Sequence, residues 1–116
     1  MTGPVSISIR ETVGGPLCIA TDDGDRVRES IAPHLRQGRR AVLSSAGVEM
    51  AITAFLSSAI GRLYGEFPEA KVDSLVVASD LPEGIEPTIE ASRRWAMAYY
   101  RDPVAYQRAI QEVLDE

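Results

Sequence analysis

The chain has 116 residues, of which 45% are hydrophobic and 25% are charged, and its formal net charge is -5. This length suits one domain, so residues 1–116 are treated as a single globular unit. The acidic balance argues against nucleic acid as a partner, since no basic cluster exceeds the pairs Arg39-Arg40 and Arg93-Arg94. No apolar run approaches the roughly 20 residues that span a bilayer, and the first ten residues do not resemble a signal peptide, so we expect a cytoplasmic protein with no membrane partner.

The beginning of the chain predicts two strands. Residues 5–9 alternate between apolar and polar side chains, as in a strand with one buried face. Gly14-Gly15-Pro16 interrupts this pattern, and an apolar run resumes directly at residues 17–20. Because turn residues separate two short strand patterns, we expect the two strands to pair as a hairpin.

A helix is predicted after the second strand. Thr21, Asp22 and Asp23 offer side-chain oxygens for the free amides of a helix start, and apolar residues then recur every four positions until Gly38. Together with Asp25, these carboxylates hint at a calcium loop. The ligand spacing and the closing glutamate of such a loop are missing, so helix capping is the better interpretation.

The middle of the chain carries the clearest pattern. Residues 41–43 predict a short buried strand, and apolar side chains from Ile52 to Tyr64 recur at spacings of three and four, as in an amphipathic helix. Residues 72–78 predict another buried strand, so the order implies a parallel crossover. Further helices are expected from Pro87 to about Tyr100 and from Asp102-Pro103 to the C-terminus. The fold class is therefore α/β.

Residues that carry chemistry are sparse. His34 is the sole histidine and Cys18 the sole cysteine, so neither a second histidine nor a paired cysteine is present to complete a zinc site or to activate a nucleophile. Cys18 lies in an apolar run and is expected to be a buried thiol. Ser44 and Ser45 follow a strand but lack the glycines of a nucleophile elbow. We expect no catalytic residue, no metal site and no cofactor.

One stretch has a recognisable motif. From Arg40 to Tyr64 the chain carries Gly47-Val48, Thr53, Phe55-Leu56, Ile60-Gly61 and Leu63-Tyr64. This order resembles the central motif of the STAS-like domains, a bacterial family of unknown function related to anti-sigma-factor antagonists. The resemblance implies a mixed β-sheet of four to five strands covered by amphipathic helices.

Two positions depart from the motif of this family. Ser44-Ser45 replace an acidic-aromatic pair, and Ala54 stands where related antagonists carry the serine that a partner kinase phosphorylates. The resemblance therefore carries over the fold better than the phosphorylation switch.

By the same resemblance, the chain is a non-catalytic protein-interaction module of bacterial signalling or regulation, and its partner is a histidine-kinase-like ATPase. The expected contact residues surround the start of the central helix: Gly47, Val48, Glu49, Thr53 and Ser57. Thr53 is also a candidate phosphorylation site, because unpaired amides and the helix dipole favour a phosphate near a helix N-terminus. A role in capping or in the first helical turn is the plainer interpretation of Thr53.

Two other functions stay open. The chain could be a small ligand-binding or enzymatic domain with Ser44, Ser45 and Asp80 at the carboxyl ends of strands, where open α/β sheets place their sites. It could instead be a structural subunit that forms a homodimer through its C-terminal helix and the aromatic residues from Trp95 to Tyr100. The helical spacing of these aromatic residues is also typical of ordinary packing.

Overall fold

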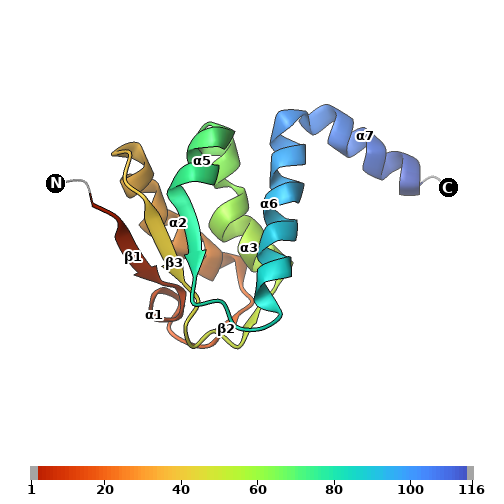
Figure 1. Ribbon diagram of the computed structural model, residues 1–116. Helices are drawn as coiled ribbons and strands as arrows, with labels where there is room; N and C mark the ends of the chain where they lie inside the picture. Colours follow the sequence, from red (N-terminus) through yellow and green to blue (C-terminus); the bar gives the residue numbers. More distant parts are fainter. Residues whose placement is uncertain (1–2, 115–116) are drawn as a thin grey trace.

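A computed structural model describes residues 3–114. These residues form an α/β unit in which helices pack against a small sheet (Figure 1). In chain order the elements are β1 (Val5–Ser8), α1 (Ile9–Val13), β2 (Leu17–Cys18), α2 (Thr21–Arg36), β3 (Ala41–Ser44), β4 (Met50–Ala51), α3 (Thr53–Leu56), the π-helical segment η1 (Ser57–Gly61), α4 (Leu63–Glu66), α5 (Glu69–Leu75), β5 (Val76–Ser79), α6 (Ile85–Arg101) and α7 (Pro103–Leu114).

The strands form two separate sheets. β3 lies between β1 and β5 in a three-stranded sheet, with Ala41 aligned to Val5 on one side and to Val76 on the other. β2 and β4 form a second sheet. The predicted parallel crossover from β3 to β5 is confirmed. The structure differs from the single mixed sheet that was expected. The five strands are divided between two sheets, and each pairing in residues 3–114 is parallel.

The predicted hairpin of residues 5–9 and 17–20 is wrong. β1 ends at Ser8, whose hydroxyl caps α1 by accepting a hydrogen bond from the Glu11 N–H at 3.1 Å. α1 then ends at Gly14, which has a φ of 91° that glycine adopts readily. Because a helical turn separates the two strands, β2 is free to pair with β4, while β1 pairs with β3.

Helices cover one face of the three-stranded sheet. In Figure 1, α2 and α3 lie behind the strands, and the residues of β3 alternate between buried and partly exposed. The core between these layers includes Ile31 of α2, Leu43 of β3 and Phe55 of α3, which are all at most 1% exposed. Their burial supplies the main driving force for folding. The central segment from Ala41 to Tyr64 therefore contributes side chains to the core as well as to the surface.

Capping of α2 by side chains is not observed. The helix begins at Thr21 with Ala20 at the N-cap position, and no side chain caps it. Asp22 and Asp23 lie in the first turn, where the helix dipole favours negative charge, and Asp23 pairs with Arg26. No group of three or more potential metal-ligating side chains gathers anywhere in residues 3–114.

The predicted central helix is present but irregular. It runs through α3, η1 and α4, and its π-helical segment packs closely against α2. A Cβ atom on Gly24 of α2 would lie 2.6 Å from the Phe55 carbonyl oxygen and 2.7 Å from Ser58 Cβ. Glycine is therefore required here by the close approach of the two helices. Such π-helical segments occur frequently at functional sites.

The second half of the chain matches its predicted helices. α6 and α7 are both present, although the strand expected at residues 72–78 starts only at Val76, because Val72 to Leu75 complete α5. A short apolar run does not distinguish a buried helical turn from a strand. α7 extends away from the body in Figure 1. None of the helices in the described part of the chain has the length and apolar character needed to cross a membrane.

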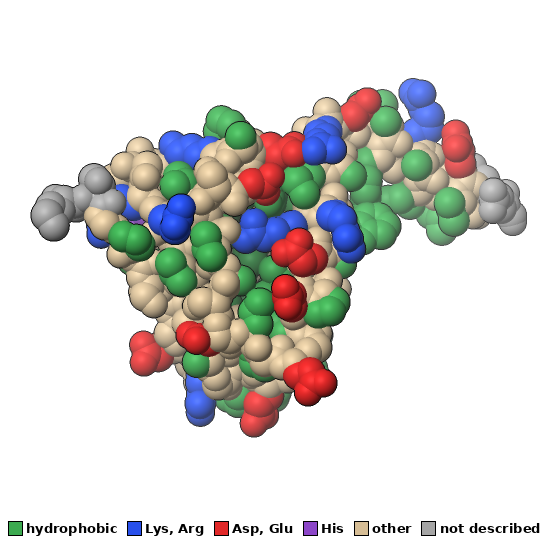
Figure 2. All heavy atoms as spheres, in the orientation of Figure 1, with side chains coloured by type: hydrophobic (Ala, Val, Ile, Leu, Met, Phe, Trp, Pro, Cys, Tyr) green, Lys and Arg blue, Asp and Glu red, His purple; other side chains and the backbone are tan. Residues whose placement is uncertain are grey.

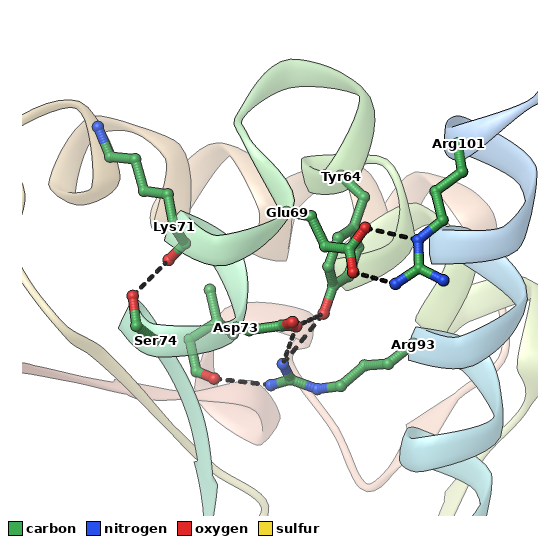
Figure 3. Close-up of polar contacts among 8 residues, drawn as sticks. Tyr64, Glu69, Lys71, Asp73, Ser74, Arg93 and Arg101 are labelled. Atoms are coloured by element: carbon green, nitrogen blue, oxygen red, sulfur yellow. Dashed lines mark hydrogen bonds and ion pairs between the residues drawn. The ribbon is translucent and has the colours of Figure 1, made fainter.

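A polar network ties α6 to the neighbouring elements (Figure 3). The Tyr64 hydroxyl donates a hydrogen bond to Asp73 at 2.6 Å. Arg93 of α6 donates to the Val76 carbonyl oxygen at 2.7 Å and to the Tyr64 hydroxyl at 3.3 Å. These contacts join α4, α5 and β5 to α6, and so they fix the position from which α7 departs.

Alkaline pH is expected to weaken the fold through Tyr64. Burial, together with the hydrogen bond to Asp73, raises the pKa of Tyr64 to about 12. Because the folded pKa is higher than the unfolded one of about 10, the stabilisation is complete below pH 10 and is lost as the pH rises towards 12. Urea unfolding at a series of pH values should show this loss, and Tyr64→Phe should show less of it. An equal loss in both proteins would contradict the assignment.

Candidate protein-interaction surface

The small β2–β4 sheet turns an apolar face to solvent. Leu17 and Met50, which are partners in register, are 50% and 49% exposed, and the following residues Ile19 and Ile52 are 47% and 36% exposed. Cys18, between Leu17 and Ile19, is fully buried. We call Leu17, Ile19, Met50 and Ile52 the docking face. Four large apolar side chains on one side of a sheet form a patch of the kind that marks interaction sites.

The backbone explains why these side chains gather. The Glu49 N–H donates to the Pro16 carbonyl oxygen at 2.8 Å, and the Ile52 N–H donates to the Cys18 carbonyl oxygen at 3.1 Å. Each strand together with the residue that follows it, Leu17-Cys18-Ile19 or Met50-Ala51-Ile52, has a small residue between two large ones. Because side chains alternate along a strand, the small residues point inward and the large ones point outward. Burial, with a smaller contribution from the nearby charge of Asp23, raises the pKa of the Cys18 thiol.

Two of the predicted contact residues, Glu49 and Thr53, directly adjoin residues of the docking face in the chain, whereas Gly47 packs beside Arg10. Gly47 has a φ of 77°, and a Cβ there would lie 2.7 Å from the Arg10 side chain. Glu49 is exposed next to Met50, and Thr53 is the exposed first residue of α3. Glu49 and Thr53 thus place polar side chains beside Met50 and Ile52. Val48 was also predicted as a contact residue, but it is only 4% exposed and its N–H donates to the Ser45 carbonyl oxygen at 3.0 Å, so it belongs to the core and not to the surface.

Ser57 lies apart from the docking face. It follows Thr53 by one helical turn and lines a cleft of about 420 Å³. The start of α2 and the segment η1 form one side of this cleft, and α6 and α7 form the other. Aromatic side chains make up much of this cleft, among them Trp95, Tyr99 and Tyr106. Tyr106 packs edge to face against Trp95 and Tyr99, with ring centroids 5.8 Å and 5.5 Å apart. These aromatic residues pack as predicted, but Trp95 stays 58% exposed.

The strand ends bring together part of the alternative site. Ser44 at the end of β3 donates a hydrogen bond to Asp80 after β5, at 2.8 Å. Ser45 is 1% exposed and its N–H donates to the Ser79 carbonyl oxygen at 3.0 Å, so it is part of the framework. His34 is in the last turn of α2, which leads to the start of β3, and it therefore does not join the Ser44–Asp80 pair at the end of that strand.

The docking face itself was not predicted from the sequence. Residues 17–20 predicted the second strand of a hairpin, and no strand was expected at Met50–Ala51. The available signal was the shared order large-small-large in Leu17-Cys18-Ile19 and Met50-Ala51-Ile52. Such a pattern is typical of a strand with a closely packed inner face and an open outer face.

Comparison with known proteins places the chain in a family. No curated protein and no solved structure shows significant similarity to it. A family model described as a STAS-like domain of unknown function matches residues 23–85, which is more than half of the chain. The match includes most of α2, β3, β4, the central helix and β5. The chain belongs to the family of STAS-like domains of unknown function.

Proposed function

We propose that the chain is a non-catalytic protein-interaction module of bacterial signalling or regulation, comparable in role to an anti-sigma-factor antagonist. The docking face is the observation that carries this proposal. Exposed apolar side chains surrounded by polar ones match the anatomy of protein interfaces, in which an apolar centre is enclosed by a polar rim. A partner that covers Leu17, Ile19, Met50 and Ile52 removes apolar surface from water and gains binding free energy.

The partner is proposed to be a histidine-kinase-like ATPase of the anti-sigma type. The basis is the resemblance of the central motif, together with the position of Glu49 and Thr53 beside the docking face. Such a partner would hold the nucleotide, so that this chain would need no cofactor. Phosphate transferred to the exposed Thr53 would add negative charge one residue from Ile52, and charge at an apolar interface weakens binding.

Arginine at Met50 tests the docking face. Affinity purification from the native host should recover an ATPase, and calorimetry with the purified partner should show that Met50→Arg weakens binding by roughly tenfold or more. Burying an unpaired charge at the centre of an apolar interface accounts for this loss. After ATP is added to the wild-type complex, the intact mass and peptide mapping report phosphate on Thr53.

A matched control separates local from general effects. Val104→Arg introduces the same charge at an exposed valine of α7, so it should bind the ATPase like the wild type. Circular dichroism should show that both variants are folded. If Met50→Arg binds the ATPase as tightly as the wild type does, the docking face is not part of the interface.

The alternative of a ligand-binding or enzymatic domain has one observation in its favour, the 2.8 Å hydrogen bond between Ser44 and Asp80. A hydroxyl beside a carboxylate can take part in proton transfer. Here the Ser44 hydroxyl also accepts a hydrogen bond from the Ala46 N–H at 3.3 Å, which makes it part of the loop structure. Metabolite turnover by the purified chain that is lost in Asp80→Asn would favour this alternative.

A further inference from the structure

The C-terminal helix lacks a covering surface in the described chain. α7 has 12 residues and none of them is buried. Its main contacts with the body are those of Tyr106 with Trp95 and Tyr99. A helix of this length is only marginally stable alone in water, and tertiary packing normally stabilises it. The apolar side of α7 is therefore expected to be covered by another molecule.

An apolar groove lies between α6 and α7. Its volume is about 470 Å³, and every residue that lines it is apolar or aromatic: Trp95, Tyr106, Ala109, Ile110, Val113 and Leu114. Trp95, Val113 and Leu114 are 58%, 68% and 73% exposed. Figure 2 shows the hydrophobic side chains along the side of α7 that faces α6.

We propose that a second copy of this chain occupies the groove, so that two α7 helices pack against each other in a two-fold dimer. The groove-lining side chains expose roughly 500 Å² in each copy, so mutual packing would bury at most about 1,000 Å², which is at the small end of specific interfaces and corresponds to a weak dimer. The charge pattern also suits self-pairing. Arg108 and Glu112, the charged residues of α7 (Pro103–Leu114), are on the side opposite the groove, so α7 brings no like charges together when identical grooves face each other.

The two helices are antiparallel in this dimer. α7 leaves the body at Pro103, and the groove opens beside α6. If the two α7 helices were parallel, the α6 of the second copy would overlap the α6 of the first copy. An antiparallel one brings the two bodies to opposite ends, with Ile110 near the two-fold axis and Leu114 of each copy beside Tyr106 of the other.

Dimerisation by this route leaves the docking face free. In Figure 1, α7 and β2 lie at opposite ends of the molecule. The dimer therefore presents two docking faces, and a partner with two binding sites gains affinity from the second contact. Dimerisation rests on α7 alone and does not depend on the identity of the docking-face partner.

Sedimentation equilibrium of the purified chain tests this dimer. Wild type is expected to show a monomer–dimer equilibrium, and Val113→Arg should raise its dissociation constant by roughly tenfold or more, because arginine places charge in the apolar groove. Val104→Arg makes the same change at a residue of similar exposure, 65% against 68%, that does not line the groove, so it should dimerise like the wild type. Met50→Arg should also dimerise normally.

Either of two results would overturn the dimer: a wild-type chain that stays monomeric at millimolar concentration, or a Val113→Arg variant that dimerises like the wild type. Cysteine pairing then tests the orientation. Ile110 lies near the two-fold axis, so Ile110→Cys chains should form a disulfide between the two copies. The two Leu114 residues are separated by about 12 Å along antiparallel helices, so Leu114→Cys chains should not form one. An efficient disulfide between Leu114→Cys chains would contradict the antiparallel arrangement.

Discussion

Gly24→Ala is expected to destabilise the domain by about 2 kcal/mol, and to lower the melting temperature by roughly 10 °C. Within a helix, alanine is normally favoured over glycine by about 1 kcal/mol, so packing must reverse the usual sign. The added methyl group would meet the Phe55 carbonyl oxygen at 2.6 Å. Because that atom belongs to the backbone of the central helix, only a shift of a whole helix can relieve the contact.

Urea unfolding of Gly24→Ala and of Gly15→Ala provides the measurement. A Cβ on Gly15 would have no heavy atom within 4 Å, and this residue does not have a positive φ. Gly15→Ala should therefore stay within about 0.5 kcal/mol of the wild type. A Gly24→Ala variant as stable as the wild type would show that α2 and the central helix do not pack as closely as described.

The Arg93→Met substitution is expected to lower the free energy of unfolding by about 2–3 kcal/mol relative to the wild type. Arg93 is 11% exposed in its side chain, and its guanidinium donates to the Val76 carbonyl oxygen at 2.7 Å. Methionine retains most of the apolar stem but leaves that carbonyl oxygen without its charged donor. Hydrogen bonds that involve a charged group contribute more than those between neutral groups.

The neighbouring arginine supplies the control for Arg93→Met. Arg94 is exposed on the same helix, so Arg94→Met should change the free energy of unfolding by less than about 0.5 kcal/mol. Thermal unfolding monitored by circular dichroism compares the two variants. Equal melting temperatures for both would mean that the network in Figure 3 contributes little to the attachment of α6.

Local patterns predicted those elements whose burial follows a regular period. The spacing of Val27, Ile31 and Leu35 identified α2, and the apolar run at Ala41–Leu43 identified the central strand β3. These patterns did not predict which strands pair with each other. Alternation at residues 5–9 shows a strand with a buried face, but the partner of that strand depends on the path of the chain through α1.

The candidate site was predicted only at its border. The family resemblance suggested Gly47, Glu49 and Thr53 as contact residues, and of these Glu49 and Thr53 adjoin the docking face in the chain. The apolar residues at its centre, such as Met50, were missed. Their exposure arises from pairing between β2 and β4, which are more than thirty residues apart in the chain, and hydrophobic residues in a sequence are expected inside by default.

Hydrogen exchange of backbone amides tests the docking face most directly. The free chain would be compared with its complex with the ATPase recovered from the host. We predict slower exchange in the complex at residues 17–19 and 47–53, with little change from 103 to 114. Slower exchange confined to residues 44–46 and 79–81, with the docking face unchanged, would contradict the proposed interface and would favour a site at the strand ends.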